Sequence, residues 1–370
     1  MCLAGAAAQG TPETATYIRE ISKYGNVELA MSGREFLSHG YDYGDIVTVA
    51  VGDQTYDMPV GSSYSDVDDG KMICRVEIGK EEDRLVLAIN MGDFASSAGI
   101  AVKTKIDGEP GYRWDCLQSD LPAISFVMKE RGGYANEYRL RQLVRTDTRE
   151  DYAHLTDEAF ANFREIETSG MGNGVLYRSS SPIDPQLGRN AYADAALHKA
   201  GIRTVINLAD TMAGAQSYPG YSESAYSACN IVALSLGLDV RSEAFEDGLA
   251  KGLRYLIAHD GPYLVHCTEG KDRAGFVSAV LQCLMGASAQ EVMEDYMTTY
   301  ENYYGVEKDS ESYGVIAENN IKKTLEDVFD IKDIEKPDVN LRYEAKAYMM
   351  ERLGLTVNEV DALIACLGSK

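Results

Sequence analysis

The sequence predicts an α/β domain with a parallel-centred sheet flanked by helices, preceded by a smaller all-β, barrel-like domain. Residues 24–145 carry short apolar runs separated by glycine-containing turns, which is typical of compact β domains. From about residue 151, helical patterns alternate with short apolar strands, which indicates parallel strands covered by helices on both faces. The 370 residues also exceed the roughly 250 to 300 that one hydrophobic core usually serves, so two domains are expected.

The polar stretch 145–151 marks the change between the two patterns. We therefore predict a flexible N-terminus over residues 1–20, a β-barrel-like domain over 21–148 and the α/β domain over 149–370. Ala6 and Ala8 precede Gln9 in an Ala-x-Ala pattern, which resembles the end of a signal peptide. This pattern favours an exported or cell-envelope protein whose leader is truncated, with a flexible cytoplasmic N-terminus as the alternative.

The composition excludes several classes of partner. A formal net charge of −23 opposes a general attraction to nucleic acid or to anionic lipid. No apolar run approaches the roughly 20 residues of a membrane span. The seven cysteines are odd in number without zinc-like spacing, and the five histidines include no close pair. We expect no nucleic-acid partner, no stable membrane insertion, no metal and no cofactor, so an anionic ligand would need a local site.

In the β domain, the pattern predicts strands joined by tight turns. Gly52-Asp53 is a hairpin turn, because glycine at the first turn position suits a type II′ turn. A second turn is expected at Gly79 to Asp83, and Gly132-Gly133 separates the last two strands. The predicted strands are Ile46–Val51, Gln54–Met58, Met72–Ile78, Leu85–Asn90, Ala123–Lys129 and Tyr134–Leu143.

In the α/β domain, helices alternate with buried strands. Phe276–Met285 is apolar nearly all round, which predicts a central buried helix. Ser288-x-x-Glu291 and Thr356-x-x-Glu359 are capping boxes that begin two further helices. The other predicted elements are the helices Asn190–Ala200 and Ala244–His259 and the strands Ile202–Leu208 and Tyr263–His266.

Cys267 lies between the strand Tyr263–His266 and the buried helix, with Arg273 six positions further on. Backbone N–H groups of Thr268 to Arg273 can curl around one centre there, because Gly270 permits the curl and the helix directs its positive end at the same point. These dipoles should lower the pKa of Cys267 into the range of roughly 3.5 to 7.5 that reactive thiols show. The pattern suits in-line attack of a thiolate on a phosphate monoester, with Arg273 binding two phosphate oxygens.

The segment His266-Cys267-x-x-Gly270-Lys271-Asp272-Arg273-x-Gly275 resembles the signature of cysteine-dependent protein tyrosine phosphatases, in the bacterial atypical branch whose loop reads Gly-Lys-Asp-Arg. Three upstream segments, 162–165, 174–179 and 201–208, are similar to that branch, so the resemblance covers about residues 151–304. It implies a cysteine-phosphatase-like fold and hydrolysis of phosphotyrosine, phosphoserine or phosphothreonine, or phosphoinositide through a phosphocysteine. The implied partner is a phosphorylated protein or phosphoinositide.

By the resemblance, Cys267 is the nucleophile, Arg273 binds phosphate and His266 tunes the thiol. Two aspartates compete for the role of general acid: Asp272 in the loop, which we favour, and Asp239, which lies where dual-specificity phosphatases carry a mobile-loop acid. The remaining predicted phosphate-binding residues are Thr268, Glu269, Gly270, Lys271, Ala274 and Gly275.

Three positions depart from the family pattern or have two interpretations. Ala274 replaces a Ser or Thr whose hydroxyl helps the thiolate leave, so phosphoenzyme breakdown should limit turnover unless Thr268 substitutes. Asp210 ends a segment that usually reads Asp-Leu-Arg, which puts the expected arginine contact in doubt. Glu269 either adds negative charge that disfavours multiply phosphorylated substrates or forms a structural ion pair with a nearby arginine.

Tyr296, Tyr300, Tyr303 and Tyr304 fall on one helical face. They predict either core packing or a wall for an aromatic phosphoester. Two other functions remain open for the loop: phosphate binding without turnover, and rhodanese-like sulfur transfer, which uses a loop of the same size.

In the β domain, Tyr24-Gly-Asn26, Ser63–Val67 and Leu87–Gly92 are similar to the C-terminal β domain of S-adenosylmethionine hydroxide adenosyltransferases. Lys80–Arg84 replaces the Ser-Gly element that this family usually carries. The resemblance implies a scaffold or recognition module, with retained nucleoside binding as the alternative.

Overall fold

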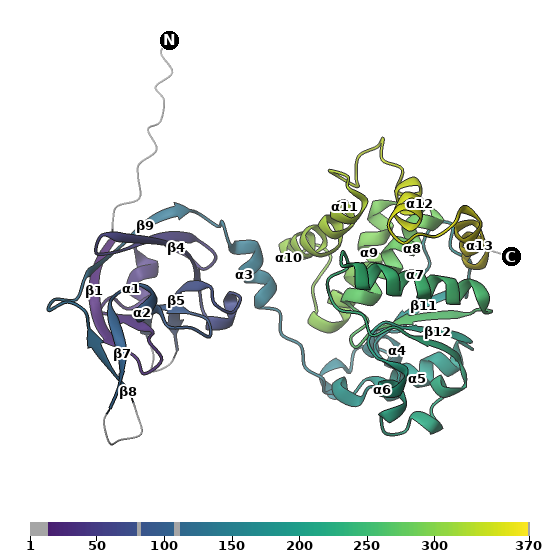
Figure 1. Ribbon diagram of the computed structural model, residues 1–370, viewed down its shortest axis with the longest axis horizontal. Helices are drawn as coiled ribbons and strands as arrows, with labels where there is room; N and C mark the ends of the chain where they lie inside the picture. Colours follow the sequence, from purple (N-terminus) through teal and green to yellow (C-terminus); the bar gives the residue numbers. More distant parts are fainter. Residues whose placement is uncertain (1–13, 80–82, 107–111, 369–370) are drawn as a thin grey trace, which may run out of the picture. The chain divides into compact units, whose positions relative to one another are not determined.

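The computed structural model describes residues 14–79, 83–106 and 112–368. The chain divides into two compact units, Met1–Leu143 and Val144–Lys370, and each is described here by itself (Figure 1). The sequence placed the division between residues 148 and 149. The stretch up to Gln9 that resembles a signal peptide lies outside the described residues, as does most of the turn expected after Gly79.

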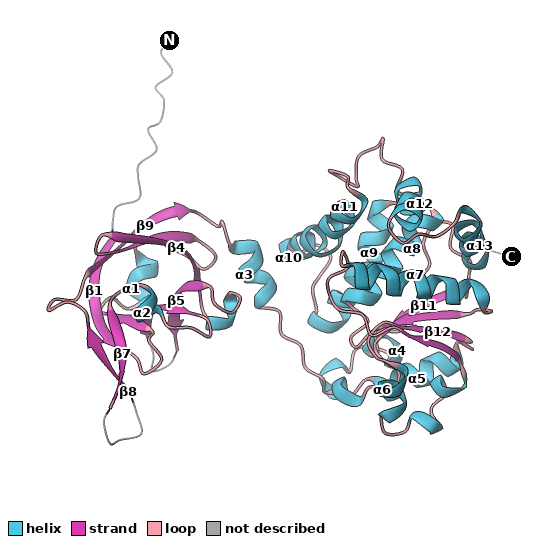
Figure 2. Ribbon diagram, in the orientation of Figure 1, coloured by secondary structure: helices cyan, strands magenta, loops and turns pink. Residues whose placement is uncertain are grey.

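In the first unit, seven strands close into a barrel in the order β1-β2-β6-β5-β4-β3-β9 (Figure 2). All neighbours in the barrel are antiparallel except β4 and β5, which are parallel. Gly52 has a φ of 58°, which the predicted hairpin turn between β3 and β4 requires. The barrel strands are β1 (Thr14–Ile21), β2 (Val27–Leu29), β3 (Ile46–Val51), β4 (Gln54–Gly61), β5 (Met72–Ile78), β6 (Asp83–Ile89) and β9 (Ala123–Glu130).

The first unit also contains two short helices and a separate hairpin. The helices are α1 (Gly33–Ser38) and α2 (Phe94–Ser97), and the hairpin pairs β7 (Ala101–Lys105) with β8 (Tyr112–Cys116). Phe36 of α1 stacks on Tyr41, with ring centroids 4.3 Å apart, and both rings are buried in the barrel core. Trp114 of β8 packs against the same core.

Two predictions for the first unit are wrong. The segment Tyr134–Leu143, predicted as a strand, forms the helix α3 (Ala135–Arg141). Its hydrogen bonds have a helical period, since the hydroxyls of Tyr134 and Tyr138, four residues apart, donate to the Asp66 carbonyl and to Ser62 Oγ. The strand β1 begins at Thr14, within the stretch predicted to be flexible; it was missed because only Thr14 and Ile18 along it are buried.

The second unit contains a five-stranded sheet in the order β10-β11-β14-β12-β13. The last four strands of this order are parallel, and β10 is antiparallel to β11. Figure 2 shows α4 to α6 on one face of the sheet and α7 and α8 on the other. The strands are β10 (Arg164–Glu165), β11 (Leu176–Ser179), β12 (Thr204–Asn207), β13 (Asn230–Ala233) and β14 (Tyr263–His266). This arrangement confirms the predicted α/β class.

The helix α8 is the centre of the second unit, because all its residues from Ala274 to Met285 are buried. Among the described residues, no helix combines the length and apolar character needed to cross a membrane. The helices are α4 (Asp157–Phe160), α5 (Asn190–Lys199), α6 (Met212–Ser217), α7 (Glu243–Ala258), α8 (Asp272–Met285), α9 (Ala289–Tyr304), α10 (Glu311–Ile316), a π-helical turn (Ala317–Lys322), α11 (Lys323–Phe329), α12 (Leu341–Glu351) and α13 (Val357–Leu367). Both predicted capping boxes are present, at Ser288 and Thr356.

Candidate active site

A loop that starts with a cysteine joins the central strand to the buried helix. This loop, residues 267–273, follows β14 directly and runs into the first turn of α8; we call it the cysteine loop. It lies at the carboxyl end of β14, beside the carboxyl ends of the parallel strands β11 and β12. Open α/β sheets hold their ligands at this edge. Cys267 itself is buried, with 3% of its surface exposed.

Side chains from outside the cysteine loop hold its carbonyl groups on the outer side. Asn162 donates through Nδ2 to the carbonyls of Glu269 and Gly270, at 3.2 Å each. The Tyr303 hydroxyl donates to the same Glu269 carbonyl at 2.8 Å. Asn162 is fixed in turn, because its Oδ1 accepts from Arg164 Nη1 at 2.6 Å.

Arg178 supplies a second set of outer bonds. This fully buried side chain donates through Nη2 to the carbonyls of Gly270 and Lys271, at 2.8 and 3.2 Å. Its Nη1 pairs with Asp295 Oδ2 at 2.7 Å, and Arg164 Nε pairs with Oδ1 of the same carboxylate at 2.8 Å. Burial alone would raise the pKa of Asp295, but the two arginines outweigh it and lower that pKa to about 2. One buried carboxylate thus anchors both arginines behind the loop.

These bonds determine which way the N–H groups of the loop face. A trans peptide is planar, so the N–H of each residue points opposite to the carbonyl of the residue before it. The Thr268 carbonyl accepts from Ser181 N at 3.1 Å, and the next three carbonyls are bonded as above. The N–H groups of Glu269–Asp272 therefore face the inner side. Within the described part of the chain, no N–H of Thr268–Arg273 donates to a protein acceptor, which leaves a set of free donors at a helix N-terminus, as in phosphate sites.

Gly270 allows this tight path. Its φ of 69° lies in the left-handed region, which favours glycine. A Cβ at this position would lie 2.2 Å from the carbonyl oxygen of Ser179, at the end of β11. Any other residue would force the loop away from β11, so the glycine keeps the loop closed against the sheet.

The Arg273 guanidinium is fixed by the ends of neighbouring strands. Nη1 donates to the carbonyls of Leu208 and Leu236, at 3.3 and 2.9 Å, and Nη2 to Thr268 Oγ1 at 3.3 Å. Nε is buried and has no hydrogen-bond partner among the described residues. The side chain is therefore held rigidly while one donor stays unpaired.

His266 contacts the main chain of Cys267 rather than a charged group. Its Nδ1 lies 3.4 Å from the Cys267 carbonyl, and its Nε2 lies 3.2 Å from the Tyr226 hydroxyl. Burial lowers the pKa of His266 to about 4, so the ring is neutral at physiological pH. We assign the proton to Nδ1, because the Tyr226 hydroxyl accepts from Asn207 Nδ2 and donates its own proton to Nε2. An effect of His266 on the thiol stays a prediction, and its contacts favour one through the backbone.

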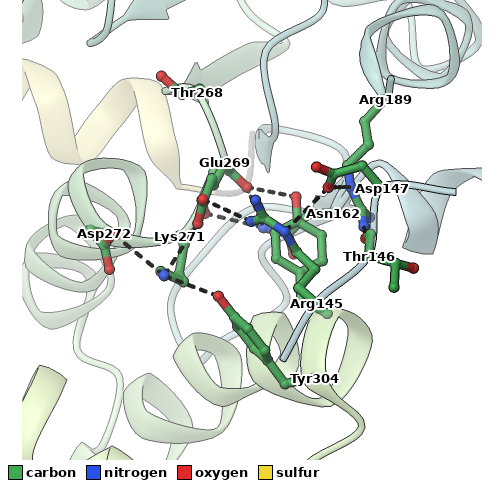
Figure 3. A network of polar contacts seen from close by, with 12 residues as sticks. Arg145, Thr146, Asp147, Asn162, Arg189, Thr268, Glu269, Lys271, Asp272 and Tyr304 are labelled. Carbon is green, nitrogen blue, oxygen red and sulfur yellow. Dashed lines mark hydrogen bonds and ion pairs between the residues drawn. The ribbon is translucent and has the colours of Figure 1, made fainter. Parts of the chain in front are cut away.

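Figure 3 shows an ion-pair network beside the loop. Glu269 pairs through Oε1 with Arg145 Nη1 at 2.7 Å and through Oε2 with Lys271 Nζ at 3.2 Å. Arg145 also pairs through Nε with Asp147 Oδ1 at 3.2 Å. Burial would raise the pKa of Glu269, but Lys271 and Arg145 outweigh it and lower that pKa. Of the two interpretations of Glu269, the structural ion pair is the arrangement observed.

The two candidate acids lie in different settings. Asp272 is in the first turn of α8, with 51% of its side chain exposed and Lys271 Nζ 3.8 Å from its Oδ2. The surrounding loop desolvates it and raises its pKa, although Lys271 acts in the opposite direction. Asp239 is exposed on the segment after β13, where its Oδ1 accepts from Arg241 N at 3.1 Å. That segment also contains Leu236, whose carbonyl binds Arg273.

Three further predicted positions contact neighbouring elements. Ala274 is fully buried in the first turn of α8. Gly275 faces α9, because a Cβ there would lie 2.7 Å from the Tyr296 ring. Asp210, where an arginine contact was in doubt, accepts from Asn207 Nδ2 and the Tyr218 hydroxyl, at 3.0 and 3.1 Å.

The four tyrosines of α9 divide between the two interpretations. Tyr296, Tyr300 and Tyr303 are buried, as core packing predicts. Tyr304 is half-buried, and its hydroxyl accepts from Lys271 Nζ at 3.3 Å (Figure 3). Lys271 lies 5.6 Å from the Tyr304 ring centroid, so this ring borders the cysteine loop.

The sequence interpretation missed the residues that support the loop from outside. Asn162 and Arg178 lie in the upstream segments that resemble the phosphatase branch. The resemblance marked these segments, but it did not indicate that their side chains bind the loop. Tyr303 was considered only for packing or as a wall. Arg145 carried no sequence signal, since it is one charged residue in a polar stretch.

Solved structures that match part of this chain include an uncharacterized conserved protein from Thermotoga maritima, at 19% identity and a TM-score of 0.24, covering 31% of this chain and 36% of that chain. A second is the core catalytic domain of the PP-IP phosphatase SIW14 from S. cerevisiae, at 15% identity and a TM-score of 0.27, covering 46% of this chain and 91% of that chain. A third is TpbA from P. aeruginosa, at 19% identity and a TM-score of 0.28, covering 43% of this chain and 84% of that chain. No curated protein matches the chain. These likenesses are too distant to carry an argument.

Family models match both units. Residues 17–107 match the C-terminal domain of S-adenosylmethionine hydroxide adenosyltransferases, which confirms the resemblance noted in the β domain. Residues 155–368, more than half of the chain, match the tyrosine phosphatase family. This second match contains the cysteine loop and every group that supports it except Arg145. The chain belongs to the tyrosine phosphatase family, and it is a phosphatase.

Proposed function

We propose that this phosphatase hydrolyses phosphate monoesters through a phosphocysteine intermediate on Cys267. The observation that carries the proposal is the orientation of the cysteine loop, whose carbonyls are bonded outward and whose N–H groups are free. The Cys267 thiolate attacks phosphorus, the S–P bond forms and the ester P–O bond breaks. Water then attacks the phosphocysteine, the S–P bond breaks, and inorganic phosphate leaves with the thiolate restored.

The same donors account for the rate enhancement. Negative charge spreads over three equatorial oxygens in the transition state, and the free N–H groups with Arg273 Nε are arranged to bind them. Arg273 needs no rearrangement, because Nη1 is already held by the carbonyls of Leu208 and Leu236 and Nη2 by Thr268 Oγ1.

The leaving-group oxygen needs a proton, and we propose Asp272 as its source. Its raised pKa supports the proposal, since a larger fraction of the carboxyl is protonated at a given pH. The activity should therefore fall as the pH rises through this raised pKa. Asp239 is the alternative, because it lies on the segment that contacts Arg273 through Leu236.

For the second step, Ala274 offers no hydroxyl to the departing thiolate. We propose Thr268 as the substitute, because it follows Cys267 directly and its Oγ1 accepts from Arg273 Nη2 at 3.3 Å. We expect slow breakdown of the phosphocysteine and therefore a burst of leaving group in stopped-flow assays with 4-nitrophenyl phosphate. Steady release without a burst would contradict this part of the proposal.

We propose substrates with a single phosphate, such as phosphotyrosine, in preference to multiply phosphorylated inositols. The charges beside the loop support this choice. Lys271 is paired with Glu269 and Asp272, and Arg145 with Glu269 and Asp147. A second phosphate would have to displace a carboxylate from one of these cations. Phosphoserine, phosphothreonine and monophosphorylated inositides satisfy the same requirement.

The central test is hydrolysis of 4-nitrophenyl phosphate by the wild type, Cys267→Ser and the exposed-cysteine control Cys116→Ser. We expect activity in the wild type and the control and none above background in Cys267→Ser. Equal activity in all three would overturn the phosphocysteine mechanism. Phosphate binding without turnover by the wild type would favour a binding module, and transfer of sulfur from thiosulfate to cyanide would favour a rhodanese-like enzyme.

The general acid is tested with Asp272→Asn and Asp239→Asn on two substrates. A poor leaving group such as phenol depends on the acid more than 4-nitrophenol does. Loss of the true acid should therefore reduce hydrolysis of phenyl phosphate about tenfold more than hydrolysis of 4-nitrophenyl phosphate. If Asp239→Asn alone shows this difference, the acid is Asp239.

A further inference from the structure

Arg145 lies against the cysteine loop, although it is far from the loop in sequence. Its side chain is 15% exposed and pairs with Glu269 Oε1 at 2.7 Å. The guanidinium carbon lies 5.4 Å from the centroid of the Tyr303 ring. The Tyr303 hydroxyl donates to the main-chain carbonyl of Glu269. Arg145 therefore contacts both the side chain of Glu269 and the ring that holds the backbone of Glu269.

The segment that presents Arg145 is held in place by buried groups. Thr146 bonds to the Tyr152 hydroxyl through its N–H and its carbonyl, at 3.2 and 3.1 Å. Arg189, only 1% exposed, donates through Nη2 to the same Thr146 carbonyl at 3.2 Å (Figure 3). Its guanidinium also lies 4.2 Å from the Tyr303 ring centroid. Arg145 is therefore presented by a fixed support.

The charges explain why the loop needs this arginine. Glu269 is 27% exposed and lies within the loop that would bind a phosphate dianion, so an unpaired carboxylate there would repel the substrate. Lys271 alone is a poor counter-charge, because it also serves Asp272. With Arg145 on Oε1 and Lys271 on Oε2, the charge of Glu269 is balanced from both sides.

We propose that Arg145 is a positioning and charge-balancing residue of the phosphatase reaction: it neutralises Glu269 and holds it away from the incoming phosphate. The proposal rests on the proposed function of the cysteine loop. By this proposal, the first residues of the second unit take part in substrate binding. These residues lie outside the span that matches the family model. The effect should appear mainly in KM, because the repulsion acts on the ground-state dianion as well as on the transition state.

The test is a double-mutant cycle with Arg145→Met, Glu269→Gln and the combined variant, assayed with phosphotyrosine. We expect Arg145→Met to raise KM about tenfold with a smaller change in kcat, and the effect to shrink at high salt. Adding Glu269→Gln should restore KM to within about threefold of the wild type, because no charge remains to balance. Arg145→Lys should be intermediate.

Two results would overturn the proposal: an unchanged KM in Arg145→Met, or a combined variant as impaired as Arg145→Met. The second result would indicate a purely structural role. Lys199→Met is the matched control, since it removes an exposed cation that pairs with Glu158 and should leave KM unchanged. Thermal melting of each variant identifies those that fail to fold. If Arg145→Met fails to fold, Arg145→Gln is used in its place.

A binding measurement separates this proposal from the mechanism. In a Cys267→Ser background, inorganic phosphate is titrated calorimetrically into proteins with and without Arg145→Met. About tenfold weaker binding supports the role of Arg145 even if the phosphocysteine mechanism fails, and equal binding overturns it. Absence of turnover in the wild type would overturn the mechanism alone.

Discussion

Two loops of this protein, one in each unit, turn several backbone N–H groups to one side. In the barrel, Asp66 Oδ2 accepts from the N–H groups of Ser62 and Ser63, at 2.6 and 2.8 Å, and Oδ1 accepts from Gln142 at 2.9 Å. Asp66 is 2% exposed, so this carboxyl group is an internal part of the barrel unit. In the cysteine loop the N–H groups have no acceptor among the residues that the structure describes, and it is the carbonyls that are bonded. The first loop binds a carboxyl group of its own chain, whereas we propose that the second binds the phosphate of a substrate.

The difference indicates how a loop with free donors keeps its shape. Free donors do not hold a loop in shape, so its shape must come from bonds on the other side. Asn162, Arg178 and Tyr303 supply those bonds. The barrel loop should therefore matter for stability alone, and the cysteine loop for both stability and catalysis. Four changes test this contrast.

The largest effect should come from Arg273→Met. The substitution removes the guanidinium donors for the transition state, and an arginine in this role contributes about 10⁴-fold to the rate of phosphoryl transfer. We expect kcat/KM for 4-nitrophenyl phosphate to fall by about that factor. The exposed Arg241→Met, which removes only a surface pair with Asp327 at 3.7 Å, is the control and should keep full activity.

Asp295→Asn should destabilise the second unit by about 3–5 kcal/mol, because it leaves Arg164 and Arg178 without their buried counter-charge. Urea unfolding measures the change. Activity should fall with it, since Arg178 holds the loop carbonyls. The control Asp157→Asn breaks an exposed pair with Arg149 and should cost less than about 1 kcal/mol. A fully active Asp295→Asn would show that the outer bonds do not shape the loop.

Acid should destabilise the second unit through His266. Its pKa falls from 6.5 to about 4 on burial, so between these values the unfolded chain binds a proton that the folded protein excludes. Stability is therefore lost as the pH falls from about 6.5 to 4, by about 3 kcal/mol for this group. Urea midpoints at several pH values measure the loss, and His266→Gln should flatten it. An unchanged slope in that variant would contradict the assignment.

The smallest effect is expected from Asp66→Asn in the barrel. The neutral amide accepts more weakly from Ser62 and Ser63, which should cost about 1–3 kcal/mol in the first unit. Hydrogen exchange of the barrel amides would report this local loss. The kcat of the phosphatase should not change, and a change would mean that the two loops are coupled.

The position and the turn of the cysteine loop could be predicted because they are local. Cys267, Gly270 and Arg273 lie within seven consecutive residues, and the flanking strand and helix have clear patterns. The supports could not be predicted, since Asn162 and Tyr303 approach the loop only through the tertiary fold. Arg145 shows the limit most plainly, because nothing in the sequence around it distinguishes it from the exposed arginines of the chain.

The fold class followed from the patterns for the same reason. Strands with regular alternation, such as Ile46–Val51, and the nearly all-apolar helix α8 were found, because burial leaves a strong signal in them. The two wrong predictions concern segments in which few residues are buried or whose secondary structure depends on contacts distant in sequence. Strand β1 buries two residues, and α3 is held as a helix by tyrosines that reach back to Asp66 and Ser62.

The sequence contains one tryptophan, Trp114, and it packs against the core of the barrel. Intrinsic tryptophan emission therefore reports on the first unit and is silent for the second. Far-ultraviolet circular dichroism is dominated by helices, most of which belong to the second unit. A single denaturant series read by both signals would give each unit its own midpoint in the intact chain, without cutting the protein or adding a label.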